Sequence, residues 1–148
     1  MNVDDPCFVD TDVLLYSFDN AHEAKQNMAR HWLDVLWQTG KGRLSWQVLN
    51  EFYDSATRKN RAPARVIRGA AELYSAWHPA TPDMALVQRA WQWIDLAGMR
   101  YWDALILASA ERAGCRWLLS EDFQTGRQYG SLSVISPFET EPEGLVIQ

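Results

Sequence analysis

Three short apolar segments constrain the fold of this chain more than any other feature of the sequence. Residues 7–10 (CFVD), 115–123 (CRWLLSEDF) and 131–138 (SLSVISPF) each contain a run of apolar, β-prone residues without regular polar alternation. Such runs are typical of strands buried on both faces, as in parallel sheets. A further brief strand is expected at the start of residues 42–59 (GRLSWQVLNEFYDSATRK), before a helix that Ser45 would cap.

Segments with helical periodicity separate these strands. Residues 22–40 predict a long amphipathic helix that Gly40 ends, and its apolar stripe contains Trp32 and Leu36. Further helices are expected directly after Asp10 and within residues 45–59, 62–77, 83–98 and 101–114. Helices between buried strands predict an α/β fold with three layers, α/β/α, in which helices flank a small, mostly parallel central sheet. The 148 residues suit one domain, 1–148, and the tail 139–148 is expected to be loosely held.

Composition and charge limit the classes of function. The net charge is −5, from 19 acidic against 14 basic residues, which argues against indiscriminate nucleic-acid binding but allows a local basic groove. No apolar run is long enough to cross a membrane, and residues 1–10 lack the pattern of a signal peptide. Cys7 and Cys115 lie in apolar surroundings, so we expect reduced core thiols in a cytoplasmic protein.

Four acidic residues are candidates for a common site. Asp10 ends the first strand, Asp122 follows a later strand, Asp103 opens an apolar helix, and Glu51 lies on a helix whose other side is apolar. Ligands of open parallel sheets bind beyond the carboxyl ends of the strands, where these acids are expected to meet. Taken singly, each acid also has a structural explanation: Asp10 and Asp103 as helix caps, Asp122 as a turn residue and Glu51 as a solvated side chain.

A group of carboxylates at one edge of a sheet predicts a divalent cation. The acids would repel one another without a cation, and Mg²⁺ or Mn²⁺ prefers oxygen ligands and contacts phosphate oxygens. The three histidines show no zinc-type spacing, and neither a glycine-rich phosphate loop nor a G-x-S-x-G motif is present. Metal-assisted phosphodiester hydrolysis is therefore favoured over nucleoside-triphosphate or serine-hydrolase chemistry.

Four segments in order resemble the motifs of PIN-domain ribonucleases, and most closely the toxins of VapBC toxin–antitoxin pairs. They are FVDTDVLLYSFD, LSWQVLNEFYDSATRK, YWDALILASAERAGCRWLLSEDFQTG and VISPF; the resemblance is weakest between residues 60 and 98. It implies a PIN-like fold and a catalytic, metal-binding set of Asp10, Glu51, Asp103 and Asp122. It also implies an RNA substrate, a homodimer, and inhibition by a small antitoxin that covers the acidic site.

Several neighbouring residues are possible accessories of that site. Position 12 is commonly Asn in this family, so Asp12 adds a negative charge that either strengthens metal binding or only caps the helix. Glu121 is a possible further ligand or water-orienting group. Thr11 and Ser120 match small hydroxyl positions that would hydrogen-bond ligands or phosphate, and capping explains them equally well.

Basic and aromatic residues suggest possible RNA contacts. The arginines recur at steps of three and four residues, although Pro63 suggests a break in the helix that would align them; the candidate contacts are Arg58, Lys59, Arg61, Arg65 and Arg68. An ordinary solvated face explains them equally well. Trp46, Tyr53 and Tyr101 would be able to stack on bases, but such aromatic residues are more often part of the core, where Trp102 in particular is expected.

The sequence therefore predicts an Mg²⁺- or Mn²⁺-dependent endoribonuclease, the toxin half of a two-component module. One alternative is a PIN-fold module that binds RNA or protein without cutting. Another is a DNA or flap-type nuclease with the same carboxylates, because the contacts that distinguish RNA from DNA are not readable in the sequence.

Overall fold

The computed structural model describes residues 5–145 and is built around a five-stranded sheet with the strand order β2-β1-β3-β5-β4. The strands are β1 (Cys7–Val9), β2 (Gly42–Arg43), β3 (Trp117–Leu119), β4 (Gln128–Tyr129) and β5 (Leu132–Ile135). All neighbouring strands are parallel except β4 and β5. Every residue of β1 and β3 is buried, which confirms the expectation drawn from their continuous apolar runs.

The sequence did not predict β4. This two-residue strand pairs antiparallel with β5 across a tight turn in which Gly130 has a positive φ of 64°. Its sequence, Gln-Tyr, has neither an apolar run nor enough length to show alternation, so only the pairing with β5 defines it as a strand.

Two helices follow β1 closely. Helix α1 (Thr11–Tyr16) begins directly after Asp10, and α2 (Glu23–Thr39) ends at Gly40, whose φ of 68° provides the left-handed C-cap that was expected there. Trp32 and Leu36 on the apolar stripe of α2 are fully buried. The Trp32 indole donates hydrogen bonds to the backbone carbonyls of Pro137 and Thr140, which ties the C-terminal segment to α2.

The next pair of helices is interrupted where Pro63 suggested a break. Helix α3 (Trp46–Arg58) begins at Ser45, whose hydroxyl accepts a hydrogen bond from the Val48 amide as an N-cap. Helix α4 (Ala64–Tyr74) begins after Pro63 and continues into the short 3₁₀ helix η1 (Ser75–Trp77). The arginines of this region are therefore divided between two helices and their connection.

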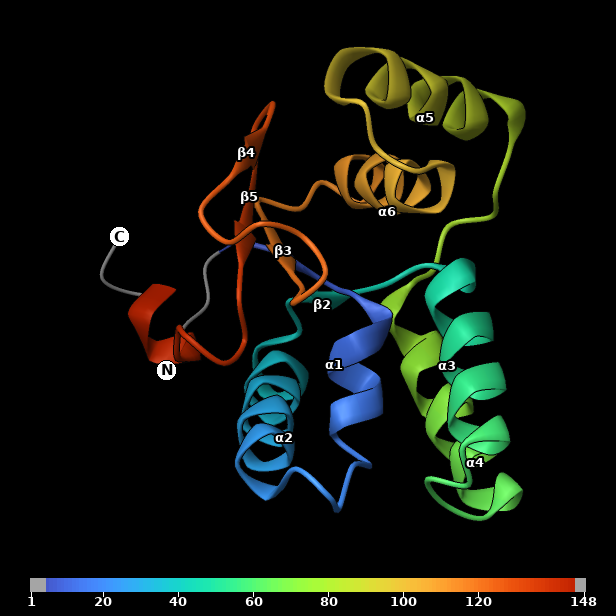
Figure 1. The fold of residues 1–148 in the computed structure, drawn as a ribbon, viewed down its shortest axis with the longest axis vertical. Coiled ribbons are helices and arrows are strands. Elements are labelled where there is room, and N and C mark those ends of the chain that lie inside the picture. The colour runs from blue at the N-terminus through green and yellow to red at the C-terminus, as the bar shows by residue number, and fades with distance from the viewer. Residues whose placement is uncertain (1–4, 146–148) are drawn as a thin grey trace.

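Helices α5 (Met84–Ala97) and α6 (Tyr101–Arg112) pack on each other. Figure 1 shows this pair at the top of the view and α1 to α4 toward the bottom, with the sheet between them. The predicted three-layer α/β/α fold with a small, mostly parallel sheet is thus confirmed. None of the helices within residues 5–145 combines the length and the apolar character that a membrane span needs.

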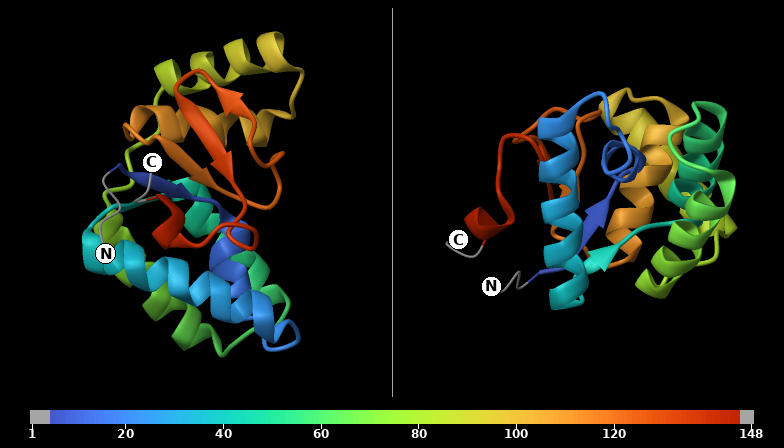
Figure 2. Two further views of the ribbon diagram at one scale, coloured as in Figure 1. Left: turned by 90° about the vertical axis from the view of Figure 1, so that its left-hand side faces the viewer. Right: turned by 90° about the horizontal axis from the view of Figure 1, so that it is seen from below.

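The segment 139–148, which is expected to be a loosely held tail, contains one short helix. A short 3₁₀ helix, η2 (Pro142–Leu145), packs beside α2, as Figure 2 shows. Pro142 and Leu145 are buried, and the Glu143 carboxylate lies 2.6 Å from the His31 ring. Residues 146–148 of the predicted tail lie outside the described range.

Candidate functional site

The candidate site lies where β1 and β3 end side by side. Val9 and Leu119 are paired in the parallel register, so the chain leaves both strands at the same edge of the sheet. The Asp10 amide donates a hydrogen bond to the Leu119 carbonyl, which extends this pairing by one residue. Residues 10–12 and 120–122 therefore meet at the carboxyl ends of the strands, where ligands of parallel sheets bind.

Asp10 is the buried member of the site. It is the N-cap of α1, and its Oδ1 accepts a hydrogen bond from the Thr11 amide at 2.8 Å while its Oδ2 accepts one from the Ser120 hydroxyl at 2.7 Å. Burial raises its pKa from 3.8 to about 6 against the effect of these hydrogen bonds, and the charges of Asp122 and Glu51 raise it further. The carboxyl group is thus held in place but is costly to ionise.

Asp12 belongs to the same cluster and does not occupy the cap position, which Asp10 holds. Its Oδ2 accepts a hydrogen bond from the Glu121 amide at 2.8 Å, and this contact positions the segment after β3. Its Oδ1 is buried and has no hydrogen-bond partner among residues 5–145. Burial raises the pKa of Asp12, as do the charges of Asp10 and Asp122. Of the two roles considered for Asp12, the structure thus favours membership in the acidic cluster.

Asp122 completes a tight group of three carboxylates. One ligand oxygen from each of Asp10, Asp12 and Asp122 lies within 4.8 Å of the others. The Asp122 amide donates to the Ser120 hydroxyl oxygen at 3.0 Å, so Ser120 links the two ends of the cluster. Asp122 lies at the surface, but its surroundings still remove part of its hydration, and this raises its pKa. The charge of Asp103 raises the pKa of Asp122 further.

Glu51 and Asp103 lie close to this group but outside it. The Glu51 carboxylate on α3 accepts hydrogen bonds from the Thr11 hydroxyl at 3.1 Å and from the Gln47 amide at 2.7 Å. Asp103, in the first turn of α6, forms an ion pair of 3.3 Å with the exposed Arg100. Both carboxylates raise the pKa of Asp122, which shows that their charges reach the cluster. Of the four predicted acids, Asp10 and Asp122 thus belong to the cluster with Asp12, whereas Glu51 and Asp103 lie beside it.

The accessory residues have specific roles in the arrangement. The hydroxyls of Thr11 and Ser120 hold the carboxylates of Glu51 and Asp10 respectively, rather than standing free for a ligand. The side chain of Glu121 forms a 2.9 Å ion pair with Lys25, whereas its backbone amide donates a hydrogen bond to Asp12. The sequence analysis did not identify Lys25, whose helix is 96 residues away from Glu121 along the chain.

The donor set fits a hard divalent cation. The three clustered groups offer carboxylate oxygens alone, which Mg²⁺, Mn²⁺ and Ca²⁺ prefer over nitrogen or sulfur ligands. The buried Oδ1 of Asp12, which has no donor within residues 5–145, is an acceptor that a bound cation would satisfy. Burial first, and then the charges of neighbouring carboxylates, raise the pKa values of Asp10, Asp12 and Asp122, and a bound cation would favour the ionised form of all three.

A comparison with protein families decides the classification. The model of the PIN domain matches residues 7–129. The chain belongs to the PIN domain family. PIN domains are typically metal-dependent nucleases, and the acidic cluster of Asp10, Asp12 and Asp122 lies within the matched segment. A comparison with curated proteins finds no match. The strand β5, which pairs with β3, lies beyond the matched segment and completes the parallel part of the PIN domain sheet.

Among the basic candidates of this PIN domain, one pairs with a buried carboxylate and the others are exposed, although Arg58 also forms an ion pair of 3.3 Å with Asp54. Arg61, in the connection between α3 and α4, forms a 3.1 Å ion pair with Asp19, a carboxylate that is 4% exposed. This contact joins the segment after α1 to the end of α3 and gives Arg61 a structural role. The remaining candidates for RNA contacts are exposed, and Arg58 also lines the hollow beside Asp12 and Asp122; these exposed residues are Arg58, Lys59, Arg65 and Arg68.

The expectation for one aromatic residue of the PIN domain is wrong. Trp102 is 59% exposed rather than in the core, because α6 turns Ala104, Leu105 and Leu107 inward and leaves position 102 at its open first turn. Trp46, at the start of α3, is 42% exposed. Two large indole rings therefore lie at the surface close to Glu51 and Asp103 in the chain. The apolar stripe of a helix does not show at which end of the helix an apolar side chain stays exposed to solvent.

Proposed function

We propose that this PIN domain is a metal-dependent endoribonuclease with Mg²⁺ or Mn²⁺ as its cofactor. The observation that carries the proposal is the convergence of Asp10, Asp12 and Asp122 at the ends of β1 and β3, where one buried carboxylate oxygen has no partner in the described part of the chain. A cation bound there would supply Lewis-acid stabilisation of the charge that develops during phosphodiester hydrolysis. The overall change is addition of water across a P–O bond, with a proton passing to the departing oxygen.

The positions of the acidic residues indicate a separate role for each in hydrolysis. Asp10, Asp12 and Asp122 would hold the cation. Glu51, kept in orientation by Thr11 and Gln47, would orient the attacking water or accept its proton. Asp103 would join the cation site on release from Arg100, whose guanidinium would then be free to pair with a substrate phosphate.

The test is cleavage of a structured RNA by the purified protein with Mg²⁺ or Mn²⁺. Wild type should cut, whereas Asp10→Asn and Asp103→Asn should lose most of the activity. Asp95→Asn is a matched control, because Asp95 is an exposed carboxylate on α5. Equal activity in wild type and both site variants would refute the assignment of the site. A DNA of the same sequence serves as the second substrate, and preferential cutting of DNA would refute the RNA specificity.

The toxin role is part of the same proposal. It rests on the resemblance of the chain to VapBC toxins, and an acidic site open to solvent suits inhibition by a small antitoxin that inserts an arginine among the carboxylates. A groove lined by Phe18, Leu33, Trp37 and Leu73 runs between α2 and α4 and offers an apolar surface for such a partner. Exposed apolar side chains on the helices, including Val66 and Leu96, would suit a homodimer.

The partner proposal is testable by expression in bacteria. Expression of this chain alone should arrest growth, and coexpression of a small protein encoded by the neighbouring reading frame should restore it. Growth unaffected by the active protein would refute the toxin role without affecting the nuclease assignment. We place this activity in the cytoplasm, where the free thiols of Cys7 and Cys115, both buried in the core, would stay reduced.

A further inference from the structure

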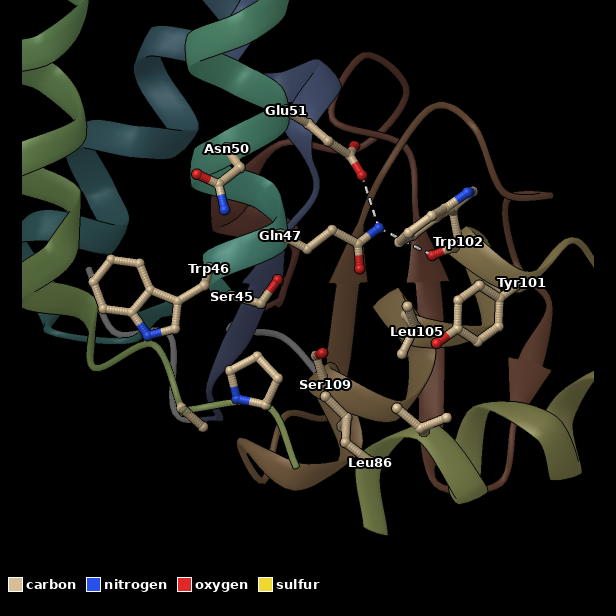
Figure 3. Close-up of a pocket in the computed structure, with 13 residues that line it drawn as sticks. Ser45, Trp46, Gln47, Asn50, Glu51, Leu86, Tyr101, Trp102, Leu105 and Ser109 are labelled. Carbon is tan, nitrogen blue, oxygen red and sulfur yellow. Dashed lines mark hydrogen bonds between the residues drawn. The ribbon is translucent and has the colours of Figure 1, made fainter. Parts of the chain in front are cut away.

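A second hollow lies beside the acidic site, between α3, α5 and α6 (Figure 3). Its volume is about 560 Å³, which is within the range of roughly 300–1,000 Å³ that is usual for small-ligand pockets. Leu86, Val87 and Leu105 contribute apolar surface to its lining. The hollow is large enough for a flat, mostly apolar group, and the nuclease mechanism described above does not use it.

Two exposed indole rings border this hollow. Figure 3 shows Trp46 from α3 and Trp102 from α6 on opposite sides of it. Trp102 packs against Tyr101 at a ring-centroid distance of 5.1 Å in a T-shaped arrangement, yet 59% of its surface remains exposed. Exposed aromatic faces beside a nucleic-acid site are the usual platform on which unpaired bases stack.

Gln47 places a hydrogen-bond acceptor at the same hollow. Its side-chain nitrogen donates to Glu51 Oε1 at 2.7 Å and to the Trp102 backbone carbonyl at 3.2 Å. Both partners are acceptors, so the orientation of the amide is fixed by its contacts. The amide oxygen of Gln47 is left facing the hollow, as Figure 3 shows.

The hollow is continuous with the acidic site. Glu51 lines both this hollow and the one that contains Asp12 and Asp122. Trp102 immediately precedes Asp103, so the first turn of α6 presents an aromatic ring and a site carboxylate together. A group bound in the hollow would therefore be the neighbour of a phosphate bound at the carboxylates.

We propose that this hollow binds one unpaired base of the RNA strand and selects a base with an exocyclic amino group. The inference rests on the proposed nuclease function and extends it to substrate recognition. The base stacks on the indole of Trp102, and its amino group donates a hydrogen bond to Gln47 Oε1. Cytosine meets this requirement, whereas uracil, which has the same shape, presents a carbonyl oxygen to the acceptor and is disfavoured.

A base fits this site better than the surface of a second copy of the chain. The occupant has to be flat and apolar on its faces, to carry a polar edge for Gln47, and to be attached to a phosphate at the neighbouring carboxylates. A stable homodimer instead needs roughly 800 Å² of contact on each subunit, which a hollow of this size does not provide by itself. The second copy is therefore the competing outcome of the experiment.

The experiment measures kcat/KM on a single-stranded RNA whose cleavage position has been mapped with the wild-type protein. One nucleotide at a time near that position is replaced by an abasic site. At one position the replacement should lower kcat/KM roughly 5- to 100-fold, as expected for loss of one stacked base. Trp102→Ala should cause a loss of similar size on the intact RNA and little further loss on the abasic RNA, because both changes remove the same contact.

Controls separate stacking from other effects. Trp91→Ala removes an exposed indole of α5 that does not line the hollow, so it should leave kcat/KM and its response to the abasic site unchanged. Trp102→Phe keeps an aromatic face and should restore most of the lost activity. At the sensitive position cytosine should be preferred over uracil by about tenfold, the worth of one hydrogen bond to a partly buried acceptor.

Three results would overturn the inference. One is that wild type cleaves the RNA and that Trp102→Ala loses as much kcat/KM at the abasic position as wild type does. Another is equal use of uracil and cytosine at the sensitive position, which would reject the selection of the amino group. The third is a Trp102→Ala protein that changes from dimer to monomer by light scattering with unchanged base dependence, which would assign the hollow to a second copy. Failure of wild type to cut RNA at all would instead reject the proposed function.

Discussion

Replacement of Asp10 by Asn is expected to stabilise the metal-free protein at neutral pH. In the folded protein the pKa of Asp10 is raised from 3.8 to about 6, chiefly by burial. A shift of about two pKa units corresponds to about 3 kcal/mol of free energy of unfolding. The protonated carboxyl contributes this stability fully below pH 3.8, and the contribution is lost as the pH rises through about 6. Asn carries no charge to bury and avoids this loss.

Two further contributions modify the expected value. Asn retains the N-cap hydrogen bond from the Thr11 amide, but its NH₂ group requires the Ser120 hydroxyl to turn away, which costs about 1 kcal/mol. Removal of the charge also lowers the pKa of Asp12, which Asp10 raises, and this adds a little stability. We therefore expect Asp10→Asn to be about 1–2 kcal/mol more stable than wild type at about pH 7.5 and no more stable below about pH 4.

The assay is urea unfolding with a chelator at several pH values between about 4.5 and 7.5. The difference between Asp10→Asn and wild type should grow by about 2 kcal/mol over this range, because most of the titration of Asp10 lies within it. Fixed costs of the substitution, such as the lost hydrogen bond, cancel in this comparison. Asp95→Asn, at an exposed position on α5, is the control and should show little dependence on pH.

A difference that is constant over the pH range would refute the reasoning, because it would show that Asp10 ionises in the folded protein as easily as in water. A variant that becomes progressively less stable than wild type as the pH rises would refute the sign of the effect. Such a result would mean that the hydrogen bonds to the carboxylate outweigh the cost of its burial.

The remaining predictions concern the cation and the packing of the fold. Millimolar Mn²⁺ should raise the melting temperature of wild type but not of Asp12→Asn; an equal rise in both would remove Asp12 from the cation site. Arg61→Ala leaves the buried Asp19 without its guanidinium partner and should lower the free energy of unfolding by about 2 kcal/mol in urea unfolding, and an unchanged midpoint would contradict this structural role. Gly42→Ala would place a Cβ 2.6 Å from the Trp77 ring and should cost about 1–3 kcal/mol in thermal unfolding; an unchanged melting temperature would show that the ring moves aside freely.

The acidic site illustrates how far sequence reasoning extends. The sequence indicates Asp10 and Asp122 because each follows a continuous apolar run, and the ends of neighbouring parallel strands meet at one edge of the sheet. The sequence does not distinguish two roles for Asp12, because a carboxylate in the first turn of a helix has the same local pattern whether it caps the helix or binds a cation. The structure favours the cation site for two reasons. The Glu121 amide, 109 residues away, donates to Oδ2 of Asp12, and Oδ1 of Asp12 has no hydrogen-bond partner among residues 5–145.

Sequence alone determined the buried strands, the helix limits at Ser45, Gly40 and Pro63, and the acids at the strand ends. These features depend on local backbone preferences and on apolar runs, which neighbouring residues specify. Tertiary structure decided the pairing of β4, the packing of η2 on α2, the exposure of Trp102 and the pairing of Arg61 with Asp19. Each of these depends on a contact between residues far apart in the chain, and the energy of such a contact leaves no periodic signal in the sequence.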